Sequence, residues 1–98
     1  MPRPPIHPGE HLAIDLDELG MSGRQLARAL AVPPNRISAI INGDRSITAD
    51  TALRLARWMG TTPEYWLNLQ RNYDLRVAQL ESGEQILREV TPHEVVSN

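Results

Sequence analysis

The residues between positions 33 and 43 carry side chains that can hydrogen-bond to the edges of DNA bases. An asparagine such as Asn35 can pair with adenine through two hydrogen bonds, and an arginine such as Arg36 can pair with guanine. A phosphate contact is the slightly favoured alternative for Arg36. The apolar residues Pro34 and Ala39 can contact thymine methyl groups. The predicted base-reading residues are Pro34, Asn35, Arg36, Ser38 and Ala39, with Asn42 on the same surface.

A second set of groups, just upstream, suits the phosphate backbone. If a helix begins after Ser22, the backbone N–H groups of its first residues face outward and the helix dipole favours an anion there. We expect those donors to come from Gly23, Arg24 and Gln25. Side chains that add positive charge without reading sequence are predicted at Arg24, Arg28 and Arg45.

Two short helices joined by a tight turn are predicted to position these groups. Ser22 and Gln25 form a capping box at the start of the first helix. The second helix begins at Pro33-Pro34, where a missing N–H does no harm, and it ends near Gly43. Their apolar residues recur at helical spacing, at Leu26, Ala27 and Leu30 and then at Ile37, Ile40 and Ile41. This is the geometry of a helix-turn-helix, which enters the DNA major groove.

Charge is unevenly distributed along the chain. The 98 residues have a net charge of −2, which by itself argues against a nucleic acid partner. Residues 22–57, however, hold six arginines and two acids, whereas the flanking segments 1–21 and 58–98 are each net −3. A basic segment between acidic flanks is typical of one face meeting phosphates. An ordinary solvated helix surface is the open alternative from charge alone.

The composition suits one small domain. A hydrophobic content of 41% supports a core, and the absence of cysteine excludes disulfides and thiolate metal sites. The chain has no apolar run of about 20 residues, as a membrane span requires, and its start lacks the apolar core of a signal peptide. We therefore expect a cytoplasmic protein with no membrane partner.

Three further helices are predicted around the central pair, so the fold class is all-α with five helices. Pro8 begins the first helix and Gly20 ends it. Thr48 caps the fourth helix, and Thr62-Pro63 begins the fifth and longest, which runs to about residue 80. The expected buried positions are Leu12, Leu16 and Leu19 in the first helix, then Ala49, Ala52, Leu53, Ala56 and Met59 in the fourth.

The chain divides into an extended, proline-rich segment 1–7, a helix-turn-helix domain 8–80 and a C-terminal tail 81–98. Ser82-Gly83 is predicted to interrupt the last helix. Beyond it, the sequence is compatible with a short helix, with a strand or with a mobile tail.

The fifth helix has apolar residues on two opposite sides. One helix of a small domain seldom buries both sides, so part of this surface is predicted to contact a second copy or a partner protein. A well-covered core helix is the alternative. The predicted interface residues are Trp66, Leu67, Tyr73, Leu75 and Ala78.

One motif resembles a metal site. His7-Pro8-Gly9-Glu10-His11 matches a histidine–glutamate pattern of some zinc peptidases, but that chemistry needs both histidines on one continuous helix. Pro8-Gly9 stands where the helix should be continuous, and the only further histidine is His93. We expect no metal, no cofactor and no enzymatic activity, because no nucleophile, base and orienting group cluster together.

From His7 to about Ala78 the chain closely resembles the HigA-type antitoxins of bacteria, a branch of the xenobiotic-response-element (XRE, repressor-like) helix-turn-helix proteins. The resemblance lies in His7-Pro8-Gly9-Glu10, in the central helices up to Asn42-Gly43, in Thr51-Ala52-Leu53-Arg54-Leu55, in the run from Gly60 to Gln70 and in Tyr73-Asp74-Leu75. The family commonly has glycine where this chain has Ala31, and often serine where it has Pro33.

This resemblance implies a five-helix domain, usually a homodimer, that represses its own operon by binding double-stranded operator DNA. It also implies a cognate toxin of the HigB type, an mRNA-cleaving protein related to RelE, which the antitoxin neutralises by direct binding. A stand-alone repressor with no toxin partner is the alternative.

Overall fold

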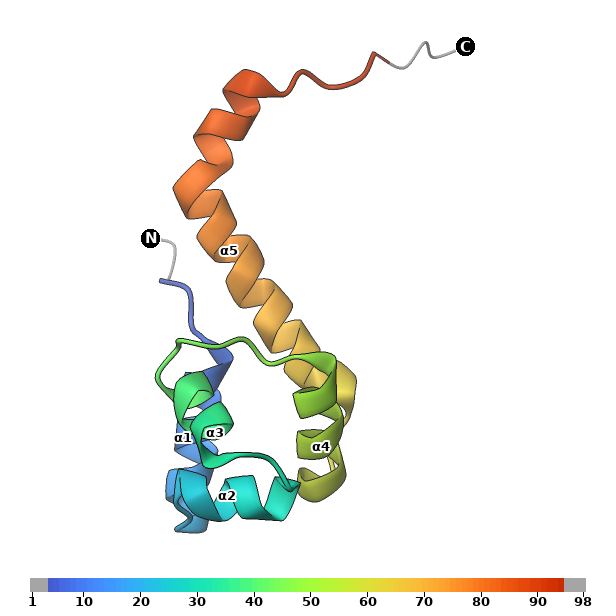
Figure 1. Ribbon diagram of the computed structural model, residues 1–98. Coiled ribbons are helices and arrows are strands. Elements are labelled where there is room, and N and C mark those ends of the chain that lie inside the picture. Colours follow the sequence, from blue (N-terminus) through green and yellow to red (C-terminus); the bar gives the residue numbers. More distant parts are fainter. Residues whose placement is uncertain (1–3, 95–98) are drawn as a thin grey trace.

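The computed structural model describes residues 4–94 and contains five helices and no strand in that range. They are α1 (Pro8–Leu19), α2 (Gly23–Leu30), α3 (Pro34–Ile41), α4 (Ala49–Met59) and α5 (Pro63–Glu89). Helices α1 to α4 and the beginning of α5 form a compact body, and the rest of α5 projects away from it (Figure 1). The resulting shape measures 56 × 30 × 23 Å. The predicted all-α class with five helices is confirmed.

The starts of the helices follow the predicted caps. Ser22 Oγ accepts from the backbone N–H of Gln25 at 3.1 Å, and Gln25 Oε1 accepts from the N–H of Ser22 at 2.8 Å. Thr48 and Thr62 cap α4 and α5 through their hydroxyl groups. Each of these caps satisfies an N–H that has no partner within its own helix. The starts of these three helices therefore follow from local sequence.

The start of α1 has a less common cap. His7 Nδ1 accepts from the N–H of Gly9 at 2.9 Å, and the carboxylate of Glu10 accepts from the N–H of His7 at 3.2 Å. Gly9 lies directly against the end of α3, where an added Cβ would overlap the carbonyl oxygen of Ile40. The His7 ring also makes an edge contact with Tyr73, with ring centroids 4.8 Å apart. This turn joins the start of α1 to α3 and α5.

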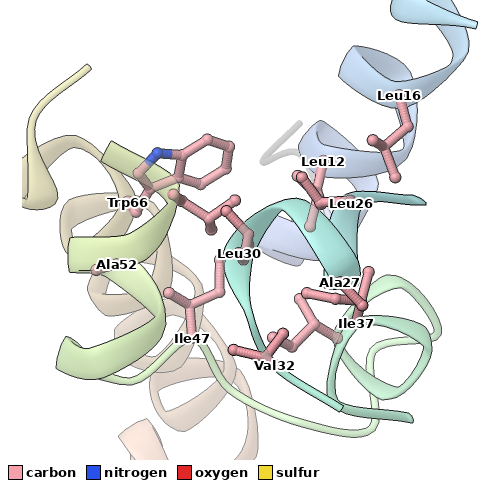
Figure 2. Close-up of a cluster of buried hydrophobic side chains, with 12 residues drawn as sticks. Leu12, Leu16, Leu26, Ala27, Leu30, Val32, Ile37, Ile47, Ala52 and Trp66 are labelled. Atoms are coloured by element: carbon pink, nitrogen blue, oxygen red, sulfur yellow. The ribbon is translucent and has the colours of Figure 1, made fainter. Parts of the chain in front are cut away.

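The core lies within the compact body, and α5 contributes a single aromatic ring to it. Figure 2 shows the Trp66 ring and side chains of α1 and α2 pointing into one common interior. Trp66 is completely buried, and its indole N–H donates to Thr61 Oγ1 at 3.1 Å. The buried cluster is Leu12, Leu16, Leu26, Ala27, Leu30, Val32, Ile37, Ile40, Ile47, Ala52, Leu55 and Trp66. Burying a side chain of leucine size contributes about 1.5–3 kcal/mol, so this cluster dominates the stability of the fold.

Several predicted core positions were wrong. Leu19 and Leu53 are exposed, and Leu55 is buried in place of Leu53. Ala49 is also exposed, and Met59 is only partly buried. Leu53 and Leu55 are separated by two residues, about 200° around a helix, so only one of them can face the core. The alanines of α4 suit either face, which is why apolar spacing alone assigned the wrong leucine.

The predicted interruption of the last helix was also wrong. Helix α5 runs for 27 residues and passes through Ser82-Gly83 to Glu89. A glycine within a helix costs only about 1 kcal/mol, and the surrounding residues are strong helix formers. Gln85 Nε2 donates to Glu89 Oε2 at 2.9 Å one turn further on, which supports this part of the helix. Residues 81–89 of the predicted tail are therefore a continuation of α5.

The predicted extended segment at the start of the chain is only partly described by the structure. Residues 4–7 precede α1 without helix or strand. Parts of the predicted terminal segments, 1–3 and 95–98, lie outside the described residues. Within the described range, no helix is both long and apolar enough to cross a membrane. The division at residue 80 stays a prediction.

Candidate nucleic-acid interface

The turn between α2 and α3 is closed by backbone hydrogen bonds and by one left-handed residue. Ala31 has φ 58° and ψ 47°, a conformation that costs an L-residue about 1–2 kcal/mol. The N–H of Val32 donates to Ala27 at 3.0 Å and tightens the turn. Pro33 precedes α3 and offers no side-chain cap. This turn determines how α3 is presented beside α2.

A groove joins the start of α2 to the exposed face of α3. It has a volume of about 610 Å³ and includes six of the predicted DNA-contacting residues. Its walls are Ser22, Gly23, Arg24, Pro34, Asn35, Ser38, Ile41 and Asn42. The structure thus brings phosphate-binding candidates from α2 and base-reading candidates from α3 onto one continuous surface.

The start of α2 presents fewer free donors than predicted. The N–H of Gln25 is already bonded to Ser22 Oγ, so it is not free for a phosphate. Gly23 and Arg24 precede it in the first turn, and both line the groove. Because the first turn of a helix is also the positive end of its dipole, these two residues are the better anion-binding candidates.

The remaining predicted DNA contacts differ in their exposure and in whether they line the groove. Arg28 and Arg45 are exposed, as a phosphate contact requires, but neither lines the groove. Ser38 is exposed within the groove, and its hydroxyl donates to the carbonyl of Asn35 at 3.3 Å. Ala39 is half-buried on α3. Asn35 and Ser38 of α3 therefore line the groove together with Arg24 of α2, whereas Arg28 and Arg45 lie outside it.

Arg36 has a partner that the sequence did not predict. Its Nη1 donates to Asp50 Oδ2 of α4 at 2.8 Å, and Arg54 Nε donates to the same oxygen at 2.9 Å. The hydrogen bond from Arg54, and then that from Arg36, lowers the pKa of Asp50 from its ordinary value of 3.8. In this structure the Arg36 guanidinium is bound to α4. The i,i+4 spacing of Asp50 and Arg54 was a readable signal, but the pairing with Arg36 was not.

The predicted interface residues of α5 fall into two groups. Trp66 belongs to the core and is unavailable to a partner, which corrects its assignment to an interface. Leu67 and Tyr73 are half-buried, whereas Leu75 and Ala78 are exposed. The sequence reading missed the exposed apolar residues that follow, namely Leu80, Ile86, Leu87 and Val90. The assumed break at Ser82-Gly83 removed Ile86 and Leu87 from the predicted helix, whereas Leu80 was within that helix but was not assigned to the interface.

The histidine motif has a structural role here. His7 Nδ1 is occupied by the N–H of Gly9, and the His7 ring packs on Tyr73. Among the described residues, no three His, Cys, Asp or Glu side chains are grouped as metal ligands.

Residues 12–66 match the helix-turn-helix family model HTH_3, which spans the groove and the core around it. An addiction module antidote protein of the HigA family from Coxiella burnetii superposes with a TM-score of 0.90 and 61% identity. That match covers 93% of this chain and 100% of that one. The chain belongs to the helix-turn-helix family, in its HigA antitoxin branch.

Two further relatives of this HigA-type chain are similar over most of their length. Antitoxin HigA-1 of Vibrio cholerae is 42% identical over 74 residues, covering 74% of this chain and 70% of that protein. Pseudomonas aeruginosa antitoxin HigA, solved with the higBA promoter, is 42% identical with a TM-score of 0.88. It covers 94% of this chain and all of the solved chain.

This HigA-type chain has Ala31 at a turn position where its family commonly has glycine, and Ala31 adopts the left-handed conformation. Glycine adopts a positive φ without strain, which is a physical reason for its frequency at this turn. Alanine is held in the same conformation here, and Arg54 Nη1 donates to the adjoining carbonyl of Leu30 at 2.9 Å.

Proposed function

We propose that this chain is the antitoxin of a type II toxin–antitoxin system. It neutralises a HigB/RelE-like mRNA-cleaving toxin by direct binding and represses its own operon as a dimer on DNA. The groove that joins the start of α2 to the exposed face of α3 is the observation that carries the DNA-binding part. A relative of the same fold, the Pseudomonas aeruginosa HigA, was solved with the higBA promoter, which supports it.

In the proposed complex, α3 lies in the major groove and the start of α2 meets a phosphate. The N–H groups of Gly23 and Arg24 donate to that phosphate, because they lie at the positive end of the α2 dipole. Asn35 is the leading base-reading residue, since it is exposed on α3 and an asparagine amide matches adenine. The other proposed contacts are Pro34, Ser38, Ala39 and Asn42 on or beside α3, with Arg24, Arg28 and Arg45 on the phosphate backbone.

A dimer is part of the proposal because one domain of this size reads only a few base pairs. Two copies on a palindrome read half-sites about 34 Å apart, one helical turn of DNA. Helix α5 is the proposed dimer element, since its second half exposes a row of large apolar side chains. Leu75 and Ala78 begin this exposed surface, and it extends to Leu80 and Leu87. The other predicted interface residues, Leu67 and Tyr73, are half-buried at the end of the helix that packs on the body.

The toxin-binding part rests on relatives named as antitoxins. Such a partner acts on mRNA, so the cytoplasm is the proposed compartment. To test this part, the tagged chain is co-expressed with the small reading frame beside its gene, and both complex formation and relief of growth arrest are measured. A stable complex with restored growth is expected. Operator binding without any complex or toxicity would instead identify a stand-alone repressor.

The DNA-binding part is tested by comparing two substitutions in the proposed interface. Asn35→Ala should cost about 1–3 kcal/mol on the operator and relax the preference at one base position. Arg28→Ala should weaken binding to every sequence and lower the salt slope by about one unit. Fluorescence anisotropy over a salt series, with operator variants, measures both quantities.

Arg71→Ala is the matched control, because it removes the same charge from an exposed position on α5. Its salt slope should equal that of the unmodified chain. Equal weakening by Asn35→Ala on all operator variants would refute base reading by Asn35. A changed slope for Arg71→Ala would show that net charge, and not the groove, governs affinity.

A further inference from the structure

Two arginines, one from the recognition helix α3 and one from α4, donate to a single exposed carboxylate. Asp50 Oδ2, in the first turn of α4, accepts from Arg36 of α3 at 2.8 Å and from Arg54 of α4 at 2.9 Å. Arg54 also donates to the carbonyls of Leu30 and Ala31 at the end of α2, at 2.9 and 3.4 Å. The only other ion pair in the described part of the chain, Arg88–Glu84, lies on α5. Asp50 is thus the common partner of both paired arginines in the basic segment.

The two arginines differ in their other contacts: Arg54 also bonds to the backbone of the turn, whereas Arg36 bonds to Asp50. Arg54 is held by backbone carbonyls of the turn that presents α3, so it keeps Asp50 in a defined place. Arg36 reaches this carboxylate across fourteen residues of sequence, and its side chain is less exposed than that of Arg54. The Arg36 guanidinium therefore lies against α4 in the free chain.

We propose that Asp50 is a specificity-determining residue: it retains Arg36 in an intramolecular ion pair, so that Arg36 positions α3 and does not bind the DNA backbone. This inference rests on the proposed function of the groove. Arginine contacts with phosphate raise affinity for all sequences alike and carry no base information. A carboxylate that occupies Arg36 removes one such contact while leaving the exposed amide of Asn35 to read bases.

The salt dependence of binding separates positioning from phosphate contact. Each phosphate neutralised by a cationic side chain contributes about 0.9 to the slope of log affinity against log salt. Affinity for an operator duplex and for an unrelated duplex is measured by anisotropy from low to high salt. The unmodified chain is compared with Asp50→Asn, Arg36→Ala and the double variant carrying both.

Asp50→Asn should steepen the slope by about one phosphate contact, because it releases Arg36. It should also tighten binding to the unrelated duplex several-fold, so that the ratio of operator to non-operator affinity falls. Arg36→Ala alone should weaken operator binding yet keep the original slope. The double variant should return to the original slope, because Arg36 is absent and Arg54 stays bonded to the carbonyls of Leu30 and Ala31.

Asp44→Asn is the matched control, since Asp44 is the other acid of the basic segment and is exposed. It changes net charge by the same amount but has no arginine to release, so its slope should stay unchanged. A circular dichroism melt of each variant checks the fold. Should Asp50→Asn melt early, Arg36→Ala tests the same assignment without altering Asp50.

Three results would overturn the inference while leaving the proposed function intact. These are an unchanged slope for Asp50→Asn, a slope reduced by about one for Arg36→Ala, and equal effects of Asp50→Asn and Asp44→Asn. Absence of operator binding by the unmodified chain would overturn this inference and the DNA-binding part of the proposed function, since both require the DNA complex.

Discussion

The compact body and the projecting half of α5 place their large apolar side chains in opposite environments. In the body, Leu12, Leu26 and Leu55 are completely buried against neighbouring helices. In the projecting half, Leu75 is 56% exposed and Leu87 is 83% exposed. Both regions are helical, and both carry leucines at helical spacing. The difference lies in whether another part of the same chain covers them.

The body buries its own apolar side chains, whereas the end of α5 leaves its large apolar side chains exposed among the described residues. A helix that packs on nothing is marginal in water, because most helical stability in proteins comes from burying an apolar face. The body supplies that burial through its core of twelve residues. The projecting half has no such cover within the described residues, which is why we assign it to the proposed dimer.

The largest expected effect is a leucine substitution in the core of the body. Leu55→Ala should lower the free energy of unfolding by about 2–5 kcal/mol, because it leaves a cavity among packed side chains. Leu53→Ala, two residues away and 59% exposed, is the control and should stay within about 0.5 kcal/mol. Urea unfolding monitored by far-ultraviolet circular dichroism measures both. Similar losses for the two variants would contradict the assigned core.

Replacing a glycine by alanine should change the free energy of unfolding by an intermediate amount. The change should be opposite in sign in the two regions. Gly9→Ala should destabilise by about 1–3 kcal/mol, since the new methyl group overlaps the backbone of Ile40. Gly83→Ala meets open space in α5 and should stabilise by about 0.5–1 kcal/mol, through better helix propensity. Thermal melts of both variants test this, and destabilisation by Gly83→Ala would show that the end of α5 is closely packed.

Glutamate substitutions on the projecting half of α5 should change stability least. Their effect on assembly should be large. Leu75→Glu combined with Leu87→Glu should change the unfolding free energy of the body by no more than about 0.5 kcal/mol, because both positions are exposed. The same pair should convert the proposed dimer to a monomer in light scattering and weaken operator binding. Arg71→Glu is the control for a charge change on an exposed, polar position of α5. A double variant that remains dimeric would place the dimer contact elsewhere.

The helix starts could be predicted because each depends on residues only a few positions apart. Ser22 with Gln25, Thr48 with Thr51 and Thr62 with Tyr65 form hydrogen bonds across three residues, and sequence spacing determines these directly. The helix-turn-helix was predicted for a related reason. Its two helices are consecutive in the chain, and residues from both line the groove.

Contacts between distant positions could not be predicted in the same way. Leu53 and Leu55 differ only in which side of α4 meets the core, and apolar spacing with many alanines did not distinguish them. The length of α5 was underestimated because a glycine is a weak break, whose effect depends on the residues around it.

By itself the sequence determined the five helix starts, the helix-turn-helix and the basic segment, because all three depend on neighbouring residues. Only the tertiary structure decided that Trp66 is buried, that Gly9 lies against Ile40 and that Asp50 pairs with Arg36. These contacts join residues far apart in the chain. Their formation depends on how whole helices pack. The local sequence around one residue does not indicate which distant residue this packing brings beside it.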